Sequence, residues 1–128
     1  GVQTCALPIF KVLVVDDEPS IRVLLSKSLG KAGHIVTEAL SATSGLKLTL
    51  DNSYDVILVD IRMPEMSGIE FFHQATAKRP ELANKIIYIT GDTSDANTRN
   101  FLQENALPYL TKPFDTKTLL KVIQNKVE

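Results

Sequence analysis

The chain of 128 residues carries 14 basic and 15 acidic side chains, for a net charge of −1. This length suits one domain with one hydrophobic core, and the balanced charge without a run of Lys or Arg argues against a surface that binds nucleic acid or a membrane. No apolar stretch approaches the roughly 18 residues that a membrane span needs. A single Cys excludes an internal disulfide framework, which fits a cytoplasmic location.

The N-terminal segment, GVQTCALPI, does not read as part of the domain. It is the literal translation of GGAGTTCAGACGTGTGCTCTTCCGATC, which resembles an adapter used in short-read DNA sequencing. We therefore expect residues 1–9 to be foreign to the natural protein and residues 10–128 to form the domain. On this interpretation Cys5 carries no information, and coding sequence upstream of Phe10 has been lost.

Short apolar runs along the rest of the chain are predicted to be the strands of one parallel sheet. The first, third and fourth runs are apolar at nearly every position, which is typical of strands buried between two layers of helices. The segments between the runs have the spacing of amphipathic helices, so the chain is predicted to be an α/β domain of strand–helix units. The predicted strands cover residues 10–15, 34–39, 55–60, 85–90 and 108–111.

The predicted helices have recognisable ends and apolar stripes. Pro19 suits a first helical turn, Gly33 follows the first helix, and Asp115 is placed to cap the last one. A second helix is predicted from Ala42 to Asp51, although Gly45 inside it costs about 1 kcal/mol relative to Ala. The stripes predicted to face the sheet contain Ile21, Leu24, Leu25, Ser28 and Leu29 in the first helix, and Leu119, Leu120, Ile123 and Val127 in the last.

Polar side chains follow the predicted strands at the points where they end. Parallel strands bring these ends to one edge of the sheet, and in open α/β sheets ligands bind at that edge. Crowded carboxylates repel one another unless a cation lies among them, and oxygen ligands without His or Cys favour Mg²⁺. The residues concerned are Asp16 and Asp17 after the first strand, Asp60 after the third, Thr90 after the fourth and Lys112 after the fifth.

This combination of groups suits phosphoryl transfer. A carboxylate can accept a phosphoryl group and form an acyl phosphate. A magnesium ion, an ammonium group and a hydroxyl can neutralise the charge on the phosphoryl oxygens. Asp60 is therefore the predicted nucleophile, with Mg²⁺ as the expected cofactor.

The segments VLVVDDEPSIR, LVDIRMPEMSG, YITGD and YLTKPF resemble the receiver domain of two-component response regulators. The resemblance extends from about Phe10 to Val127. It implies a flavodoxin-like fold, in which helices flank a five-stranded parallel sheet of order 2-1-3-4-5. It also implies that a histidine kinase or a histidine phosphotransfer domain donates a phosphoryl group to Asp60, which then changes the surface formed by the fourth helix, fifth strand and fifth helix.

The resemblance further assigns the contacts of the metal and the phosphoryl group. It implies that Asp16 and Asp17 bind Mg²⁺ together with Asp60 and the backbone carbonyl of Arg62. The Thr90 hydroxyl and the Lys112 ammonium are expected to contact the phosphoryl group. Family members place a cis peptide bond after that lysine, which here is the bond from Lys112 to Pro113.

Residues outside these contacts are implied in switching and in the lifetime of the acyl phosphate. Tyr109 matches the aromatic residue that follows Thr90 inward on activation. Arg62 and Asp92 occupy the positions that influence how readily water attacks the acyl phosphate. Such a domain catalyses its own phosphorylation and dephosphorylation without being a stand-alone enzyme.

Other classes of protein share parts of this pattern. A haloacid dehalogenase-type phosphatase also forms an aspartyl phosphate and is the main alternative, but it needs a second Asp where this chain has Arg62. A flavodoxin-like nucleotide-binding protein needs a Gly- or Ser-rich phosphate loop, whereas the loop after the first strand carries Asp16, Asp17 and Glu18. A degenerate receiver that acts only as a scaffold is disfavoured because no site residue is missing.

The segment GDTSDANTRNFLQENALPYLTKPF resembles receivers that are fused behind histidine kinases. Because the chain ends just past the fifth predicted helix, we expect a receiver from the C-terminal end of a hybrid kinase, with a free-standing receiver as the alternative. Asn105 and Ala106 stand where relatives often carry Gly, so the fourth helix is expected to stop at Asn105.

Overall fold

The computed structural model of the chain describes residues 9–91 and 95–127. The segment expected to be foreign therefore lies outside the described residues except for Ile9, and Asp92 lies outside them as well. The elements in chain order are β1 (Lys11–Val15), α1 (Pro19–Lys31), β2 (Ile35–Ala39), α2 (Ala42–Asp51), β3 (Val56–Asp60), α3 (Gly68–Lys78), the 3-10 helix η1 (Pro80–Asn84), β4 (Ile86–Thr90), α4 (Ala96–Glu104), β5 (Tyr109–Thr111) and α5 (Thr116–Val127). In these described ranges no helix is both long and apolar enough to span a membrane.

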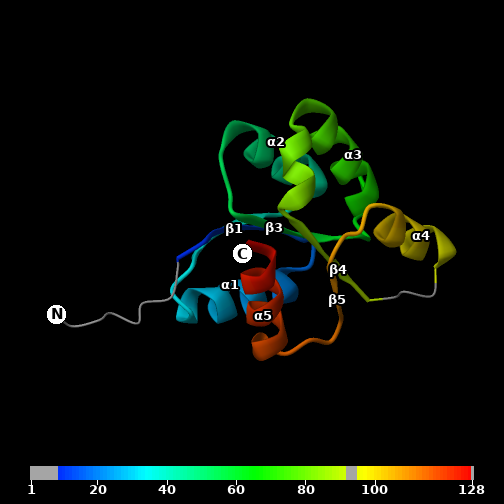
Figure 1. The fold of residues 1–128 in the computed structure, drawn as a ribbon. Coiled ribbons are helices and arrows are strands. Elements are labelled where there is room, and N and C mark those ends of the chain that lie inside the picture. The colour runs from blue at the N-terminus through cyan, green and yellow to red at the C-terminus, as the bar shows by residue number, and fades with distance from the viewer. Residues whose placement is uncertain (1–8, 92–94, 128) are drawn as a thin grey trace.

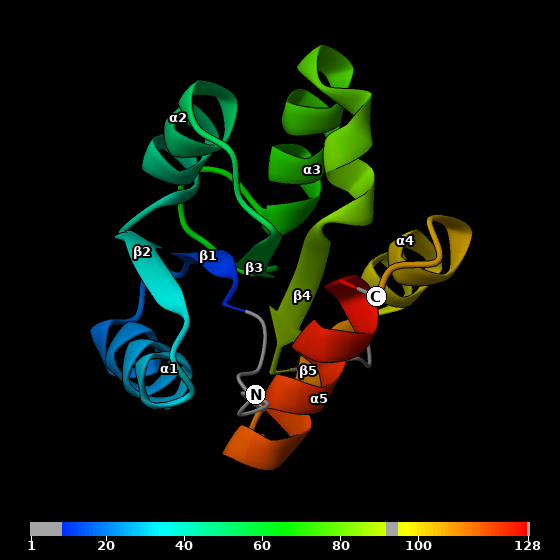
Figure 2. The same cartoon turned by 60° about the vertical axis from the view of Figure 1, so that its left-hand side comes forward.

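The five strands form one parallel sheet in the order β2-β1-β3-β4-β5, which confirms the predicted doubly wound fold. Figures 1 and 2 show α2, α3 and α4 on one face of the sheet and α1 and α5 on the other. Both faces of the central strands β1, β3 and β4 are covered, and every residue of β3 and β4 is buried. The continuous apolar runs in the sequence reflect this double coverage.

The core is divided by the sheet into two layers, because successive strand residues point to opposite faces. Along β1, Leu13 and Val15 face the α2–α4 side, whereas Val12 and Val14 face the α1–α5 side. The same alternation continues along β3 and β4. The helices are thus held on both faces by one set of strands, and the strand ends are fixed relative to one another.

The apolar stripe of α1 differs from the predicted one. Leu25 and Leu29 are buried as expected. The third buried residue of the helix is Arg22, whereas Leu24 is 46% exposed. In α5 the stripe is confirmed at Leu119 and Ile123, whereas Val127 at the helix end is 38% exposed. The prediction for α1 was wrong because counting apolar residues gives no weight to a charged side chain on the buried face.

The predicted helix ends agree with the structure. Pro19 is the first residue of α1, and Gly33 has a φ of 95°, which favours glycine. Asp115 accepts a hydrogen bond from a backbone N–H of the first turn of α5 (2.7 Å). Helix α4 ends at the C-cap Asn105, as predicted, but the left-handed residue that follows is Ala106, with a φ of 50°.

The structure also accounts for the glycine inside α2. A Cβ atom on Gly45 would lie 2.7 Å from Cγ2 of Val15, the last residue of β1. Gly45 therefore allows α2 to pack closely against the end of β1. This close approach compensates for the lower helix propensity of glycine.

Candidate functional site

The polar residues predicted at the strand ends converge at one edge of the sheet. Asp16 follows β1, Asp60 ends the neighbouring strand β3, and Asp17 lies nearer the surface in the loop after β1. Each of the three offers a carboxylate oxygen, and these oxygen atoms all lie within 4.8 Å of one another. The structure thus brings together side chains from positions 16, 17 and 60, as the parallel arrangement predicted.

Asp16 is the most deeply buried of the three acids, with an exposed fraction of 0%. Its Oδ1 accepts a hydrogen bond from the backbone N–H of Glu18 (2.9 Å), whereas its Oδ2 has no hydrogen-bond partner among the described residues. Burial raises the pKa of the Asp16 carboxyl from 3.8 to about 6; the hydrogen bond from Glu18 opposes the shift, and the nearby charge of Asp60 adds to it. This carboxyl is held where its charged form is unfavourable.

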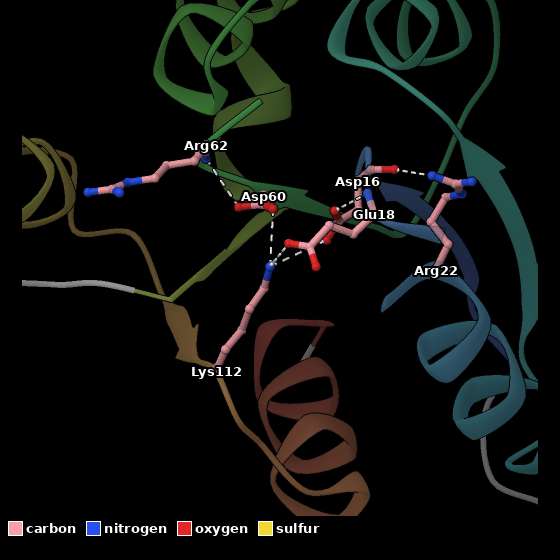
Figure 3. A network of polar contacts seen from close by, with 6 residues as sticks. All are labelled: Asp16, Glu18, Arg22, Asp60, Arg62 and Lys112. Carbon is pink, nitrogen blue, oxygen red and sulfur yellow. Dashed lines mark hydrogen bonds and ion pairs between the residues drawn. The ribbon is translucent and has the colours of Figure 1, made fainter. Parts of the chain in front are cut away.

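Lys112 supplies the positive charge of the site (Figure 3). Its Nζ lies 3.2 Å from Oδ2 of Asp60, 3.2 Å from Oε1 of Glu18 and 3.9 Å from Oδ2 of Asp16. Burial lowers the pKa of the ammonium, but the charges of Asp60 and Asp16 outweigh burial, and the net pKa lies above its usual value. The lysine therefore stays charged among the acids.

The backbone fixes the lysine relative to the end of β4. Thr90, which is buried, pairs with Thr111 across β4 and β5, and the backbone carbonyl of Thr90 accepts a hydrogen bond from the N–H of Lys112 (2.8 Å). The peptide bond between Lys112 and Pro113 is cis, the isomer implied by the family resemblance. Thr90 and Lys112 are thus parts of one ladder, and their spacing does not depend on a flexible loop.

Asp60 is held by the loop that leads from β3 to the start of α3. The backbone N–H of Arg62 donates to Oδ1 of Asp60 (3.1 Å), and the N–H of Gly68 donates to the carbonyl of Ile61 (2.8 Å). A Cβ atom on Gly68 would lie 2.6 Å from the backbone oxygen of Asp60. The buried Tyr88 hydroxyl donates to the carbonyl of Gly68 (2.8 Å), which holds α3 against β4. Only glycine permits this approach.

Other predicted residues lie away from the acids. The side chain of Arg62 extends away from Asp60 in Figure 3. Tyr109 on β5 is 47% exposed and lies beside a surface pocket with Leu102 of α4. Asp92 lies outside the described residues, so its expected influence, with Arg62, on the lifetime of the acyl phosphate stays a prediction.

Three residues that contribute to the site were not predicted. Glu18 contacts Lys112, Gly68 allows the close approach of α3, and the buried Arg22 donates from Nη1 to the backbone oxygen of Asp16 (2.6 Å). Glu18 and Gly68 belong to the motif segments that were recognised, but the residue types alone do not reveal these contacts. For Arg22, position within the helix gave the opposite expectation, since the predicted stripe left it out.

The donor atoms fit a divalent metal ion. Carboxylate oxygens are the ligands that Mg²⁺ prefers, and a single hard cation can relieve the repulsion among three acids. Oδ2 of Asp16, one of the three clustered acids, is buried without a hydrogen-bond partner in the described structure, as expected for an atom that binds an ion. Asp16, Asp17 and Asp60 are therefore the residues that could hold Mg²⁺.

Comparison with known proteins identifies the family. Residues 12–124 match the response regulator receiver domain. The chain belongs to this family. The match favours the predicted receiver over the phosphatase alternative, and receiver domains take phosphoryl groups from histidine kinases.

Individual relatives differ in how much of them this receiver covers. It is 34% identical to protein PilH of Pseudomonas aeruginosa over 113 residues, which is 88% of this chain and 93% of PilH. It is 30% identical to the sensor kinase CckA of Brucella abortus over 119 residues, which is 91% of this chain but 12% of CckA. The chain spans less than half the length of several other curated relatives.

A solved structure extends the comparison to the fold. The response regulator protein TrrA of Thermotoga maritima, in complex with Mg²⁺-BeF, matches with a TM-score of 0.76 at 31% identity, over 91% of this chain and 97% of TrrA. The receiver fold of the chain is therefore shown by sequence and by structure.

Proposed function

We propose that this receiver accepts a phosphoryl group on Asp60 from a histidine kinase or a histidine phosphotransfer domain, with Mg²⁺ bound by Asp16 and Asp17, and acts in a cytoplasmic phosphorelay. The observation that carries the proposal is the position of Asp60: its Oδ2 lies 3.2 Å from Nζ of Lys112 at the edge of a cluster of three carboxylates. The TrrA structure, which is a complex with Mg²⁺-BeF, supports the same chemistry.

The two oxygens of Asp60 have different partners, which supports separate tasks for them. The N–H of Arg62 holds Oδ1, which leaves Oδ2 facing Lys112. In transfer, a bond forms between a carboxylate oxygen and phosphorus while the bond from phosphorus to the donor imidazole breaks, and its electron pair stays on the imidazole nitrogen. When bound by the three acids and the backbone carbonyl of Arg62, Mg²⁺ would neutralise charge on the phosphoryl oxygens.

Lys112 changes partners in this scheme. Before transfer its ammonium pairs with Asp60 and Glu18. After transfer the phosphoryl oxygens offer it a more concentrated negative charge, and the ammonium stabilises the acyl phosphate. Thr90 ends β4 next to Lys112, since its backbone carbonyl accepts from the Lys112 N–H, and its hydroxyl is proposed to contact the same phosphoryl oxygens.

Thr90 and Tyr109 are proposed to convert phosphorylation into a change of surface. A phosphoryl group gives the buried Thr90 hydroxyl a new acceptor, and movement toward it leaves space behind the end of β4. Tyr109, exposed on the neighbouring strand, can then turn inward and change the surface of α4, β5 and α5. The two states need to differ by only a few kcal/mol for both to be populated.

Direct modification tests the assignment of Asp60. We expect acetyl phosphate with Mg²⁺ to add one phosphoryl group to the intact chain, located at Asp60 by peptide mass spectrometry, and Asp60→Asn to abolish it. Asp55 is an exposed aspartate just before β3, and Asp55→Asn is the matched control that should leave the modification unchanged. Undiminished modification of Asp60→Asn would contradict the proposal, and steady hydrolysis of phosphate monoesters would favour the phosphatase.

Two variants of Thr90 test the switch: one removes the hydroxyl of this residue and the other removes only its methyl group. We expect Thr90→Ala to bind beryllofluoride at Asp60 but to show little change in the ring NMR signals of Tyr109, whereas Thr90→Ser, which keeps a hydroxyl, should retain the response. Equal responses in all three proteins would show that Thr90 is not the coupling residue.

Arg62 is proposed to limit the access of water to the acyl phosphate together with Asp92. We expect Arg62→Ala to lose phosphoryl groups faster than the wild-type chain while still becoming phosphorylated. Radiolabel decay measures this, and an identical decay rate would remove the role.

The parent protein is proposed to be a hybrid kinase, with a free-standing receiver as the alternative. The chain covers 93% of PilH but only 12% of the sensor kinase CckA, so receivers similar to it occur both nearly alone and as a small part of a kinase. The reading frame upstream of Phe10 in the natural gene would decide between the two.

A further inference from the structure

Arg22 is a charged residue on the buried face of α1. Its exposed fraction is 8%, and its guanidinium contacts the residue that follows β1 and a residue of β2. Nη1 donates to the backbone oxygen of Asp16, just after β1 (2.6 Å; Figure 3). Nε lies 3.5 Å from Oε1 of Glu38 in β2. The residue therefore links α1 to the loop that carries the acids.

A buried guanidinium is unfavourable unless its donors are satisfied. An apolar side chain would fill this position of an amphipathic helix at lower desolvation cost, as Leu25 and Leu29 do on the same face. The short contact with the Asp16 oxygen is a charge-assisted hydrogen bond, which is stronger than a neutral one. The desolvation cost of burying Arg22 indicates that the role of this residue is to hold the peptide group that it contacts.

The contact controls the direction of the Asp16 side chain. Figure 3 shows the backbone oxygen of Asp16 pointing toward Arg22 and its carboxylate lying on the other side, near Lys112 and Asp60. Asp16 lies just past the last residue of β1, and its own N–H makes a longer bond to Ala39 (3.3 Å). The bond from Arg22 therefore holds the carbonyl of the peptide group that joins Asp16 to Asp17, which lies beyond the last paired residue of β1.

We propose that Arg22 is a positioning residue for the metal site: it holds the Asp16 peptide so that the carboxylate stays among the other acids and is preorganised to bind Mg²⁺. This inference rests on the proposed Mg²⁺ site. Without the anchor, repulsion from Asp60 favours rotation of the Asp16 carboxylate away from the cluster. Binding the cation would then first require the loop to be reordered, which lowers affinity.

Arg79 offers a matched control within the same chain. Its Nη1 also donates to backbone oxygens, those of Thr49 (3.0 Å) and Asn52 (3.2 Å), and its Nε pairs with Glu81 (3.0 Å). These contacts lie where α2 and α3 end, away from the strand ends that carry the acids. Loss of either arginine removes bonds to main-chain carbonyls, but only Arg22 contacts the metal-binding loop.

The experiment compares Mg²⁺ binding by the wild-type chain, Arg22→Met and Arg79→Met, using isothermal titration calorimetry on protein shown to be folded by circular dichroism. We expect Arg22→Met to bind Mg²⁺ about tenfold more weakly, which is the size of effect seen when partners of metal ligands are removed. Arg79→Met should keep the wild-type affinity, although both variants melt at lower temperature. Arg22→Lys, which keeps the charge but not the planar fork, should restore only part of the affinity.

A second measurement needs no metal. The Glu18 N–H is bonded to Oδ1 of Asp16, so its hydrogen exchange reports on the position of the Asp16 carboxylate. We expect faster exchange of this N–H in Arg22→Met and unchanged exchange in Arg79→Met. If Arg22→Met does not fold, Glu38→Gln weakens the same anchor from an exposed residue and should lower Mg²⁺ affinity by a smaller factor.

The outcomes separate this inference from the proposed function. Unchanged Mg²⁺ affinity in Arg22→Met, or an equal loss in Arg79→Met, overturns the positioning role while the Mg²⁺ site stands. If Arg22→Met does not fold, unchanged affinity in Glu38→Gln overturns it instead. A wild-type chain that does not bind Mg²⁺ overturns the proposed site, and the inference falls with it.

Discussion

The two edges of the sheet use aspartate in opposite ways. At the edge where the strands begin, Asp55 is exposed, and its Oδ2 accepts a hydrogen bond from the backbone N–H of Lys11 (2.7 Å). At the edge where the strands end, Asp16 is fully buried, and its Oδ2 has no hydrogen-bond partner among the described residues. The first acid joins two strands and stabilises the fold, whereas the second is held in a position that favours its protonated form.

The difference indicates that the acidic edge does not stabilise the metal-free protein, which is expected of the ligand site that we propose there. Burial and the charge of Asp60 disfavour the ionised form of Asp16, and Lys112 opposes them only in part. Such a site is unfavourable until a cation or a phosphoryl group completes it. Substitutions at the two edges should therefore change stability in different directions.

The largest expected effect comes from adding a side-chain atom at Gly68, where α3 lies close to the backbone of Asp60. Gly68→Ala places a Cβ atom 2.6 Å from the Asp60 backbone oxygen and 2.9 Å from Cα of Ile61, so the backbone must move. We expect a loss of about 3 kcal/mol or more in the free energy of unfolding, measured by urea denaturation. Gly30→Ala in α1 is the control: nothing lies within 4 Å of its added Cβ, and it should be neutral or slightly stabilising. Equal effects of both changes would contradict this account of Gly68.

Asp16→Asn should sharpen the contrast between the edges. Removing the unfavourable charge is expected to stabilise the metal-free protein at pH 7 by up to about 3 kcal/mol, the equivalent of a pKa raised from 3.8 to about 6. Asp55→Asn, in contrast, weakens a bond between strands and should destabilise by about 1 kcal/mol or less. Urea denaturation without Mg²⁺ measures both, and destabilisation by Asp16→Asn would refute the idea that this charge is unfavourable.

The gain from Asp16→Asn should depend on pH in a defined direction. Because the folded carboxyl binds its proton more tightly than the unfolded one, the wild-type protein loses stability from this group as the pH rises from 3.8 to about 6, and the loss persists above that range. The difference between wild type and variant should therefore be small below pH 3.8 and reach its full size above about pH 6. A difference that is constant with pH would point to a change in packing.

The smallest expected effect concerns the end of α4, away from the acids. Ala106 has a φ of 50°, in the left-handed region that favours glycine. Ala106→Gly should stabilise by about 1 kcal/mol, since the Cβ of alanine is strained there, and should leave Mg²⁺ affinity unchanged. Thermal unfolding with and without Mg²⁺ tests this, and a loss of stability would show that the alanine side chain makes a compensating contact.

The sequence was sufficient for features that depend on local pattern and on strand order. Each predicted strand lies within one residue of the observed one, because buried strands read as apolar runs that end at polar residues. Asp16, Asp60 and Lys112 could be assembled in advance because parallel strands bring their ends to one edge.

The features that were missed depend on packing between distant elements. The distance between Gly68 and the Asp60 oxygen is set by how α3 meets β3 and β4, and no property of glycine alone reveals it. Glu18 and Lys112 lie 94 positions apart, so their ion pair follows from the three-dimensional arrangement of the loops. Leu24 was expected to be buried and Arg22 was ignored because hydrophobic periodicity cannot recognise a charge whose partner is a main-chain carbonyl.

The positions of the three tyrosines allow the intrinsic fluorescence of this chain to report on its surface. It contains no Trp and three Tyr, of which Tyr54 and Tyr88 are buried and Tyr109 is half exposed. Without tryptophan to accept excitation energy, tyrosine emission can be observed directly, and a collisional quencher such as acrylamide reaches chiefly the ring of Tyr109. Fluorescence quenching of the unlabelled protein therefore follows a single residue on the surface of α4 and β5, and inward rotation of that ring would be recorded as a loss of quenching.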